Sequence, residues 1–108
     1  MTRINIFKDA DGCYTGFRCE GHAEYADEGS DIVCSAVSAV TIGCCNAIEK
    51  LTQDVMTVES EGGKGLLAVD FPDGLSHDGS LLMDAMSLTL RDIANEYSSY
   101  IEFHIEEV

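Results

Sequence analysis

The stretch that decides the fold is residues 31–51, DIVCSAVSAVTIGCCNAIEKL. Apolar side chains cover most of a helix circumference along it, which predicts a helix buried at the centre of the protein. Asp31, or Ser30 before it, is the kind of residue that caps a helix N-terminus. Gly43 and the β-branched residues lower the helix propensity, so we expect tertiary packing to hold this helix together.

Two strand pairs, a second helix and a last strand surround the central helix. The alternating segments that predict two hairpins are residues 3–8 with 14–20, and residues 55–60 with 65–71. Apolar residues then recur at helical spacing from Leu82 to Tyr97, and residues 101–106 alternate as a half-buried strand. The order ββαββαβ predicts one α+β domain over residues 1–108, with two helices packed on one face of a mostly antiparallel five-stranded sheet.

The chain is strongly acidic. It has 108 residues, with 6 basic and 20 acidic side chains and a formal charge of −14. Such a charge repels phosphate backbones, which argues against direct nucleic-acid binding, and it attracts basic protein partners. The first residues lack the pattern of a secretory signal, and no apolar run approaches the ~20 residues that span a bilayer. We therefore expect a cytoplasmic protein without a membrane partner.

The five cysteines are odd in number and lack the spacing of a disulfide framework or a zinc site. We expect Cys44 and Cys45 to pack as small core residues, and Cys13 and Cys19 to share one packed face of a strand. The sequence contains no Gly-rich phosphate loop or dinucleotide fingerprint. We expect a reduced protein without a metal or cofactor.

Cys34 occupies the third helical position if Asp31 is the cap. The unpaired amides and the positive dipole end of a first helical turn stabilise an anion, here a thiolate. Some of those amides could also form an oxyanion hole. The alternative is a buried, inert cysteine, which is the commoner state of a free cysteine taken alone.

His22 follows Gly21 at the end of a predicted strand and precedes an acidic segment, residues 23–30, that we expect to be a mobile loop. A hairpin packed on the helix would bring His22 to Cys34. A thiol and a base are the two groups that thiol-based nucleophilic catalysis needs. His77 and His104 lie in ordinary polar positions.

Three further residues each have two interpretations. Asp31 could orient His22, but the helix-cap interpretation is the stronger one. Ser38, one turn after Cys34, could line a pocket or bond back to a helix carbonyl. Tyr25 could close over a substrate or pack on the surface, and packing is favoured.

The segments Gly21-His22-Ala23 and 29–39, GSDIVCSAVSA, together resemble the signature of the ribosomal-processing cysteine protease family Prp. The resemblance implies a small, cytosolic, dimeric bacterial endopeptidase. It implies removal of an N-terminal extension from the precursor of large-subunit ribosomal protein number twenty-seven, by cleavage after a short motif that ends in aromatic residues. By position, Cys34 would be the nucleophile and His22 the general base or imidazolium partner, with Asp31 and Ser38 at family positions. Loop 23–30 would become ordered around the bound peptide.

Two hypotheses result. The first is a Cys-His endopeptidase that acts on a ribosomal protein precursor, which is basic and would be attracted by the charge of −14. The alternative is a non-catalytic, acidic ribosome-assembly or regulatory binding module in which Cys34 is structural. The reactivity of Cys34 separates them.

Overall fold

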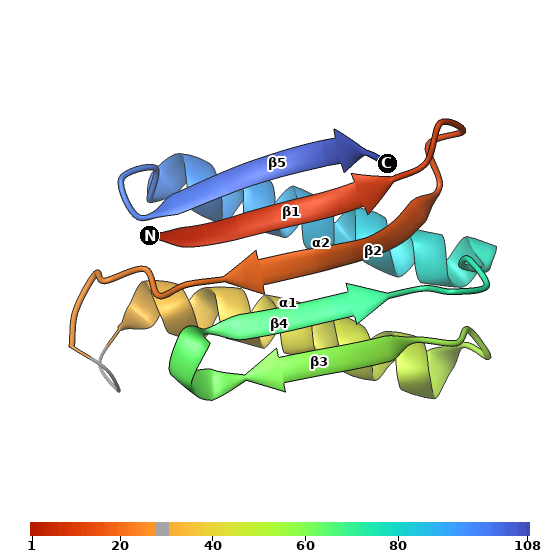
Figure 1. Cartoon of the computed structure of the whole chain (residues 1–108), viewed down its shortest axis with the longest axis horizontal. Helices are drawn as coiled ribbons and strands as arrows, with labels where there is room; N and C mark the ends of the chain where they lie inside the picture. Colours follow the sequence, from red (N-terminus) through yellow and green to blue (C-terminus); the bar gives the residue numbers. More distant parts are fainter. Residues whose placement is uncertain (28–30) are drawn as a thin grey trace.

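The computed structural model describes residues 1–27 and 31–108, and its elements follow in the predicted order (Figure 1). They are β1 (Thr2–Lys8), β2 (Tyr14–Glu20), α1 (Ile32–Leu51), β3 (Thr57–Glu61), the short 3-10 helix η1 (Gly62–Lys64), β4 (Leu66–Asp70), α2 (His77–Glu96) and β5 (Ile101–Glu107). The predicted α+β class and element order are confirmed.

The five strands form one mixed sheet in the order β3-β4-β2-β1-β5. The pairs β1–β2, β2–β4 and β3–β4 are antiparallel, and only β1–β5 is parallel, as expected for a mostly antiparallel sheet. The first hairpin turns at Asp9, whose carboxylate accepts hydrogen bonds from the amides of Asp11 and Cys13 at 2.9 and 3.0 Å. Asp9 therefore supplies the turn chemistry that alternation alone does not.

Both helices lie on the same face of the sheet, α2 behind β1 and β5 and α1 behind the β4 side (Figure 1). The core forms between these two layers. Its fully buried side chains include Ile4, Ile6, Phe17 and Val69 from the sheet and Val33, Ile48, Met83 and Leu90 from the helices. Alternate residues of β1 point to this face, which explains the period-2 pattern of that strand.

Helix α1 is buried on one face and not all round, so the expected central helix is wrong in this respect. Its buried positions are Val33, Val37, Thr41, Cys44, Cys45 and Ile48. Ile32, Ile42 and Leu51 are instead between 50% and 71% exposed. The reason is the two-layer architecture, because a helix on one face of a sheet has no second layer to cover its outer side.

The expectation that no apolar run is long enough for a membrane is also wrong. Within the described residues, α1 is the one helix that is long and apolar enough to cross a bilayer, judged by length and composition. The core helix of a globular fold passes the same criterion, and α1 contributes six buried positions to this core.

The four cysteines other than Cys34 fall into two groups. Cys19, Cys44 and Cys45 are buried, whereas Cys13 is exposed, so the expected packing of Cys13 is wrong. It precedes β2 and belongs to the turn. Burial is the main cause that raises the pKa of Cys19 to about 12 and the pKa of Cys44 to about 11. The charge of the nearby Cys45 thiolate is a smaller cause in the same direction. These buried thiols stay protonated and pack as small apolar groups.

Two glycines give opposite predictions for stability. A Cβ at Gly43, inside α1, would meet nothing within 4 Å, whereas a Cβ at Gly16 would lie 2.4 Å from the carbonyl oxygen of Val69 on β4. We expect Gly43→Ala to raise the free energy of unfolding by up to ~1 kcal/mol through helix propensity. Gly16→Ala should lower it by roughly 1–3 kcal/mol, because a backbone atom must move. Urea denaturation measures both, and equal effects of the two substitutions would contradict the packing of β2 against β4.

The sheet register brings three chain segments to one end of the molecule. Cys19 on β2 lies opposite Leu67 on β4. Two residues further along the antiparallel pair, the Gly21 amide donates to the Lys64 carbonyl at 3.1 Å. The end of β2, the turn before β4 and the start of α1 therefore meet, and the candidate site lies there.

Candidate active site

Cys34 lies in the first turn of α1, with a half-buried side chain. Asp31 is the N-cap of this helix, and the alternative cap, Ser30, lies outside the described residues. One oxygen of the Asp31 carboxylate accepts hydrogen bonds from the amides of Val33 and Cys34, both at 3.0 Å. The cap therefore fixes the position of Cys34 in the helix.

The amide that contacts the Cys34 sulfur comes from the loop and not from the helix. The Ala23 N–H donates to Cys34 Sγ at 3.2 Å. The first-turn amides of Val33 and Cys34 are instead committed to Asp31. The expectation that the first-turn amides touch the sulfur is therefore wrong, and the amides of Val33 and Cys34 are not free to form an oxyanion hole. A thiolate would be stabilised by the Ala23 amide and by the helix dipole.

The second oxygen of Asp31 joins the loop to the helix. It accepts a hydrogen bond from the Tyr25 amide at 3.0 Å. Asp31 is buried, which raises the pKa of its carboxyl, but hydrogen bonds from the backbone of Cys34, Tyr25 and Ala26 outweigh burial and hold this pKa below its usual range. Both oxygens bind backbone amides, so Asp31 acts as a cap and loop anchor, and among the described residues no hydrogen bond joins it to the His22 ring.

The lowered pKa of Asp31 gives a pH-dependent prediction. A carboxyl with a folded-state pKa below its unfolded value of about 3.9 stabilises the fold fully above that value. This contribution is lost as the pH falls through the folded-state pKa. We expect Asp31→Asn to lower the free energy of unfolding by about 1 kcal/mol or more near neutral pH, because one of the two accepting oxygens becomes an amide nitrogen that cannot accept a hydrogen bond. Denaturant unfolding at several pH values should show the difference from wild type shrinking below about pH 4. A difference that is constant across this range would contradict the charged cap.

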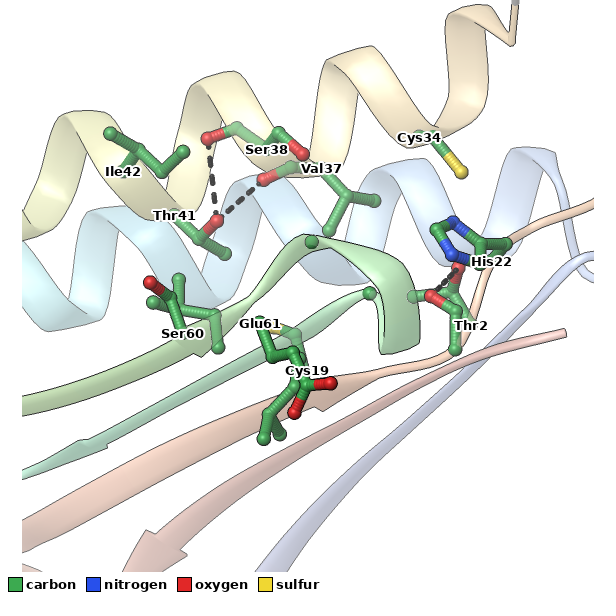
Figure 2. A pocket seen from close by; sticks show the side chains of 15 residues that line it. Thr2, Cys19, His22, Cys34, Val37, Ser38, Thr41, Ile42, Ser60 and Glu61 are labelled. Atoms are coloured by element: carbon green, nitrogen blue, oxygen red, sulfur yellow. Dashed lines mark hydrogen bonds between the residues drawn. The ribbon is translucent and has the colours of Figure 1, made fainter. Parts of the chain in front are cut away.

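His22 is exposed and lies directly after β2. Its ring atom Nε2 is 3.3 Å from the carbonyl oxygen of Gly63 in η1. In Figure 2 the sulfur of Cys34 is directed towards the His22 ring, and both side chains line the same two cavities. The structure thus brings the predicted cysteine and histidine together.

An apolar groove of about 370 Å³ extends from this pair between α1 and the β3–β4 hairpin (Figure 2). Cys34 and His22 lie at one end, and Ile42 and Ser60 lie farther along the groove (Figure 2). Its other apolar lining includes Cys19, Val37, Leu66 and Leu67. A groove of this kind suits an extended peptide whose side chains are apolar or aromatic.

A second cavity, of about 510 Å³, opens on the loop side of the same pair. Three acidic side chains, Glu24, Asp27 and Asp31, contribute to its lining. Cys34 and His22 therefore lie where an apolar and an acidic cavity meet. A peptide crossing this junction would place one bond beside the sulfur.

The structure places the supporting residues as follows. Ser38 is exposed and lines the apolar groove, with no hydrogen bond from its hydroxyl among the described residues. Tyr25 packs edge-on against Tyr97 and Tyr100, with ring centroids 5.8 and 5.2 Å apart. Gly21 has φ +89°, and a Cβ there would lie 2.4 Å from the Met1 carbonyl oxygen, so this position requires glycine. The roles of these three residues in substrate binding stay predictions.

Sequence reasoning missed two groups of the site, the Ala23 amide and the Gly63 carbonyl. Both are backbone atoms, so no residue type marks them. The Gly62-Gly63 pair in a hairpin turn was the one available signal, and it is equally typical of a turn without any further role. His77 and His104 are exposed and are not part of the site.

The fold and the site fit the class of small α+β thiol hydrolases with a Cys-His pair. Comparisons with known proteins agree. The model of the cysteine protease Prp family matches residues 1–102. The ribosomal processing cysteine protease Prp of Staphylococcus aureus is 29% identical to this chain, over 96% of this chain and 98% of its own length. The Prp of Bacillus subtilis is also 29% identical, over 90% of this chain and 90% of its own length.

Solved structures give the same result. The crystal structure of an essential ribosomal processing protease Prp from S. aureus with a covalently linked product peptide has a TM-score of 0.93 at 28% identity, covering 98% of this chain and all of that one. The same protease with a substrate peptide has a TM-score of 0.88 at 27% identity, with the same coverage. The chain belongs to the Prp family of ribosomal processing cysteine proteases. It is therefore a cysteine protease, and the non-catalytic alternative is set aside.

Proposed function

We propose that this protease removes the N-terminal extension from the precursor of large-subunit ribosomal protein number twenty-seven, with Cys34 as nucleophile and His22 as general base. The observation that carries the proposal is the position of these two side chains at the junction of two cavities on a Prp fold. The S. aureus relative binds a substrate peptide in one structure and a covalently linked product peptide in another.

The reaction follows the ordinary course of a thiol protease. His22 takes the proton of the Cys34 thiol, and the sulfur attacks the carbonyl carbon of the scissile bond. The peptide bond breaks as the leaving amine takes the proton from His22, and a thioester remains on Cys34. His22 then removes a proton from water, which attacks the thioester and releases the carboxylate product together with the regenerated thiol.

The two cavities support an orientation for the substrate. The apolar groove suits the aromatic residues that the family resemblance implies before the cleaved bond. The acidic cavity suits the segment after the bond, because a ribosomal protein is basic there as elsewhere. The net charge of −14 would also speed the encounter with such a substrate.

The test is to incubate the reduced wild-type protein with the extended precursor and to read the products by mass spectrometry. We expect one cleavage that releases the extension. The matched substrate control replaces the aromatic residues before the cleavage site by alanine, and it should be cut much more slowly. A precursor that stays whole at neutral and mildly alkaline pH would contradict the substrate assignment.

We also propose that the protein acts in the cytoplasm as a homodimer without binding nucleic acid directly, as the family resemblance implies. The exposed apolar residues Ile32 and Ile42 are consistent with a protein interface near the groove, and the charge of −14 is consistent with no affinity for nucleic acid. Analytical ultracentrifugation measures the oligomeric state, and a monomer at micromolar concentration would contradict the dimer.

A further inference from the structure

The His22 ring has one hydrogen-bond partner among the described residues, and this partner is a backbone atom. His22 Nε2 lies 3.3 Å from the Gly63 carbonyl oxygen. A carbonyl oxygen can only accept a hydrogen bond, so this contact requires the proton on Nε2. In the neutral ring, Nδ1 is then the nitrogen that holds the lone pair.

Asp31 is the carboxylate that could also orient the His22 ring, but its oxygens bind other groups. Asp31 lines the same acidic cavity as His22, but its two carboxylate oxygens accept hydrogen bonds from the amides of Val33, Cys34 and Tyr25. In many nucleophile–base pairs a third group orients the base. Here the group in contact with the ring is the Gly63 carbonyl.

The turn that carries this carbonyl is fixed against the His22 segment. The Lys64 carbonyl accepts a hydrogen bond from the Gly21 amide, and the Gly62 carbonyl accepts one from the Gly65 amide, both at 3.1 Å. Gly65 has φ +59°, and a Cβ at this position would lie 2.5 Å from the Gly21 carbonyl oxygen and 3.3 Å from His22 Cε1. The close approach of turn and ring therefore depends on the absence of a side chain at residue 65.

We propose that Gly63 is a positioning residue, whose carbonyl holds the proton of His22 on Nε2 so that Nδ1 takes the thiol proton of Cys34. The proton moves from Sγ to Nδ1, which gives a thiolate and an imidazolium whose Nε2–H still donates to Gly63. The Ala23 amide, next in the chain to His22, donates to Sγ, so the sulfur lies beside the backbone of this histidine. Because Nε2 contacts the Gly63 carbonyl, Nδ1 is the ring nitrogen left to accept the proton. The inference rests on the proposed catalytic roles of Cys34 and His22.

The direct test is ¹⁵N NMR of the histidine rings in the Cys34→Ala variant, at a mildly alkaline pH at which imidazole is neutral. The His22→Gln variant assigns the His22 signals by their loss. We expect protonated Nε2 and unprotonated Nδ1. A neutral ring with its proton on Nδ1 would overturn the proposal. This readout needs no activity, so it is independent of whether the proposed substrate is cleaved.

A set of glycine variants tests the effect on catalysis. Gly65→Ala should reduce kcat by up to roughly a hundredfold, because it displaces the turn from the ring. Gly74→Ala is the matched control, since Gly74 has φ +74° but an added Cβ would meet nothing within 4 Å.

The NMR tautomer separates positioning from a merely structural role. A Gly65→Ala protein, also carrying Cys34→Ala for the spectrum, should show a mixture of the two neutral His22 tautomers. Wild-type kcat in a folded Gly65→Ala variant would contradict the proposal. If Gly65→Ala does not fold, the tautomer in the protein with the native turn still decides the question.

Discussion

Cys34→Ala is expected to abolish cleavage of the extended ribosomal precursor, with a fall in rate on the order of 10⁴-fold or more. The physical reason is that in the proposed mechanism the sulfur forms the covalent bond to the substrate, and Cys34 is the one described cysteine that lines both cavities with His22. Cys19, the other thiol in the groove, is buried, and burial raises its pKa to about 12. Single-turnover cleavage followed by mass spectrometry measures the effect.

Two controls make this result specific. Cys13→Ala removes an exposed thiol outside the site and should leave the rate unchanged. Cys34→Ser keeps the size of the side chain and should still be severely impaired, because a hydroxyl is a much poorer nucleophile without stronger activation. If Cys34→Ala cleaves the precursor at the wild-type rate, the nucleophile is a different residue.

The second large effect is expected from His22→Ala, which should lower kcat by roughly 10²- to 10⁴-fold. In the proposed mechanism the ring accepts the thiol proton and passes it to the leaving amine, so both steps lose their proton carrier. His22 is exposed, so its truncation should leave the fold intact, as circular dichroism can verify. Added imidazole should restore part of the rate because it can enter the open site.

His104→Ala is the matched control for this experiment. His104 is also exposed but lies on β5, away from both cavities at Cys34. Its removal should leave kcat and KM unchanged. If His22→Ala left kcat unchanged, as expected for His104→Ala, the assignment of His22 as general base would be contradicted.

Local patterns in the sequence were sufficient to predict the helices and strands of this fold and their order. Asp31 before an apolar run identified the start of α1, and this placed Cys34 in the first helical turn, as the structure confirms. The alternation in residues 101–106 identified β5. These features are decided by side chains a few residues apart, so the sequence displays them directly.

Burial around α1 was not predictable in the same way. The helix reads as apolar on most sides, yet Ile32 and Ile42 are exposed. Which side of an apolar helix is buried depends on where the sheet and α2 lie. The sequence of the helix alone does not indicate this side. The amides of the first turn were misjudged for a related reason, because the geometry of one carboxylate decides whether they are occupied.

The sequence by itself determined the helix cap and the order of the elements, and it indicated the proposed reactive pair, His22 and Cys34. Only the tertiary structure decided how His22 is held. The pairing of β4 with β2, rather than any local signal, brings the Gly63 carbonyl to the His22 ring and the Gly21 amide to Lys64. Such contacts join residues more than 40 positions apart through backbone atoms, which every residue shares, so only the folded chain can specify them.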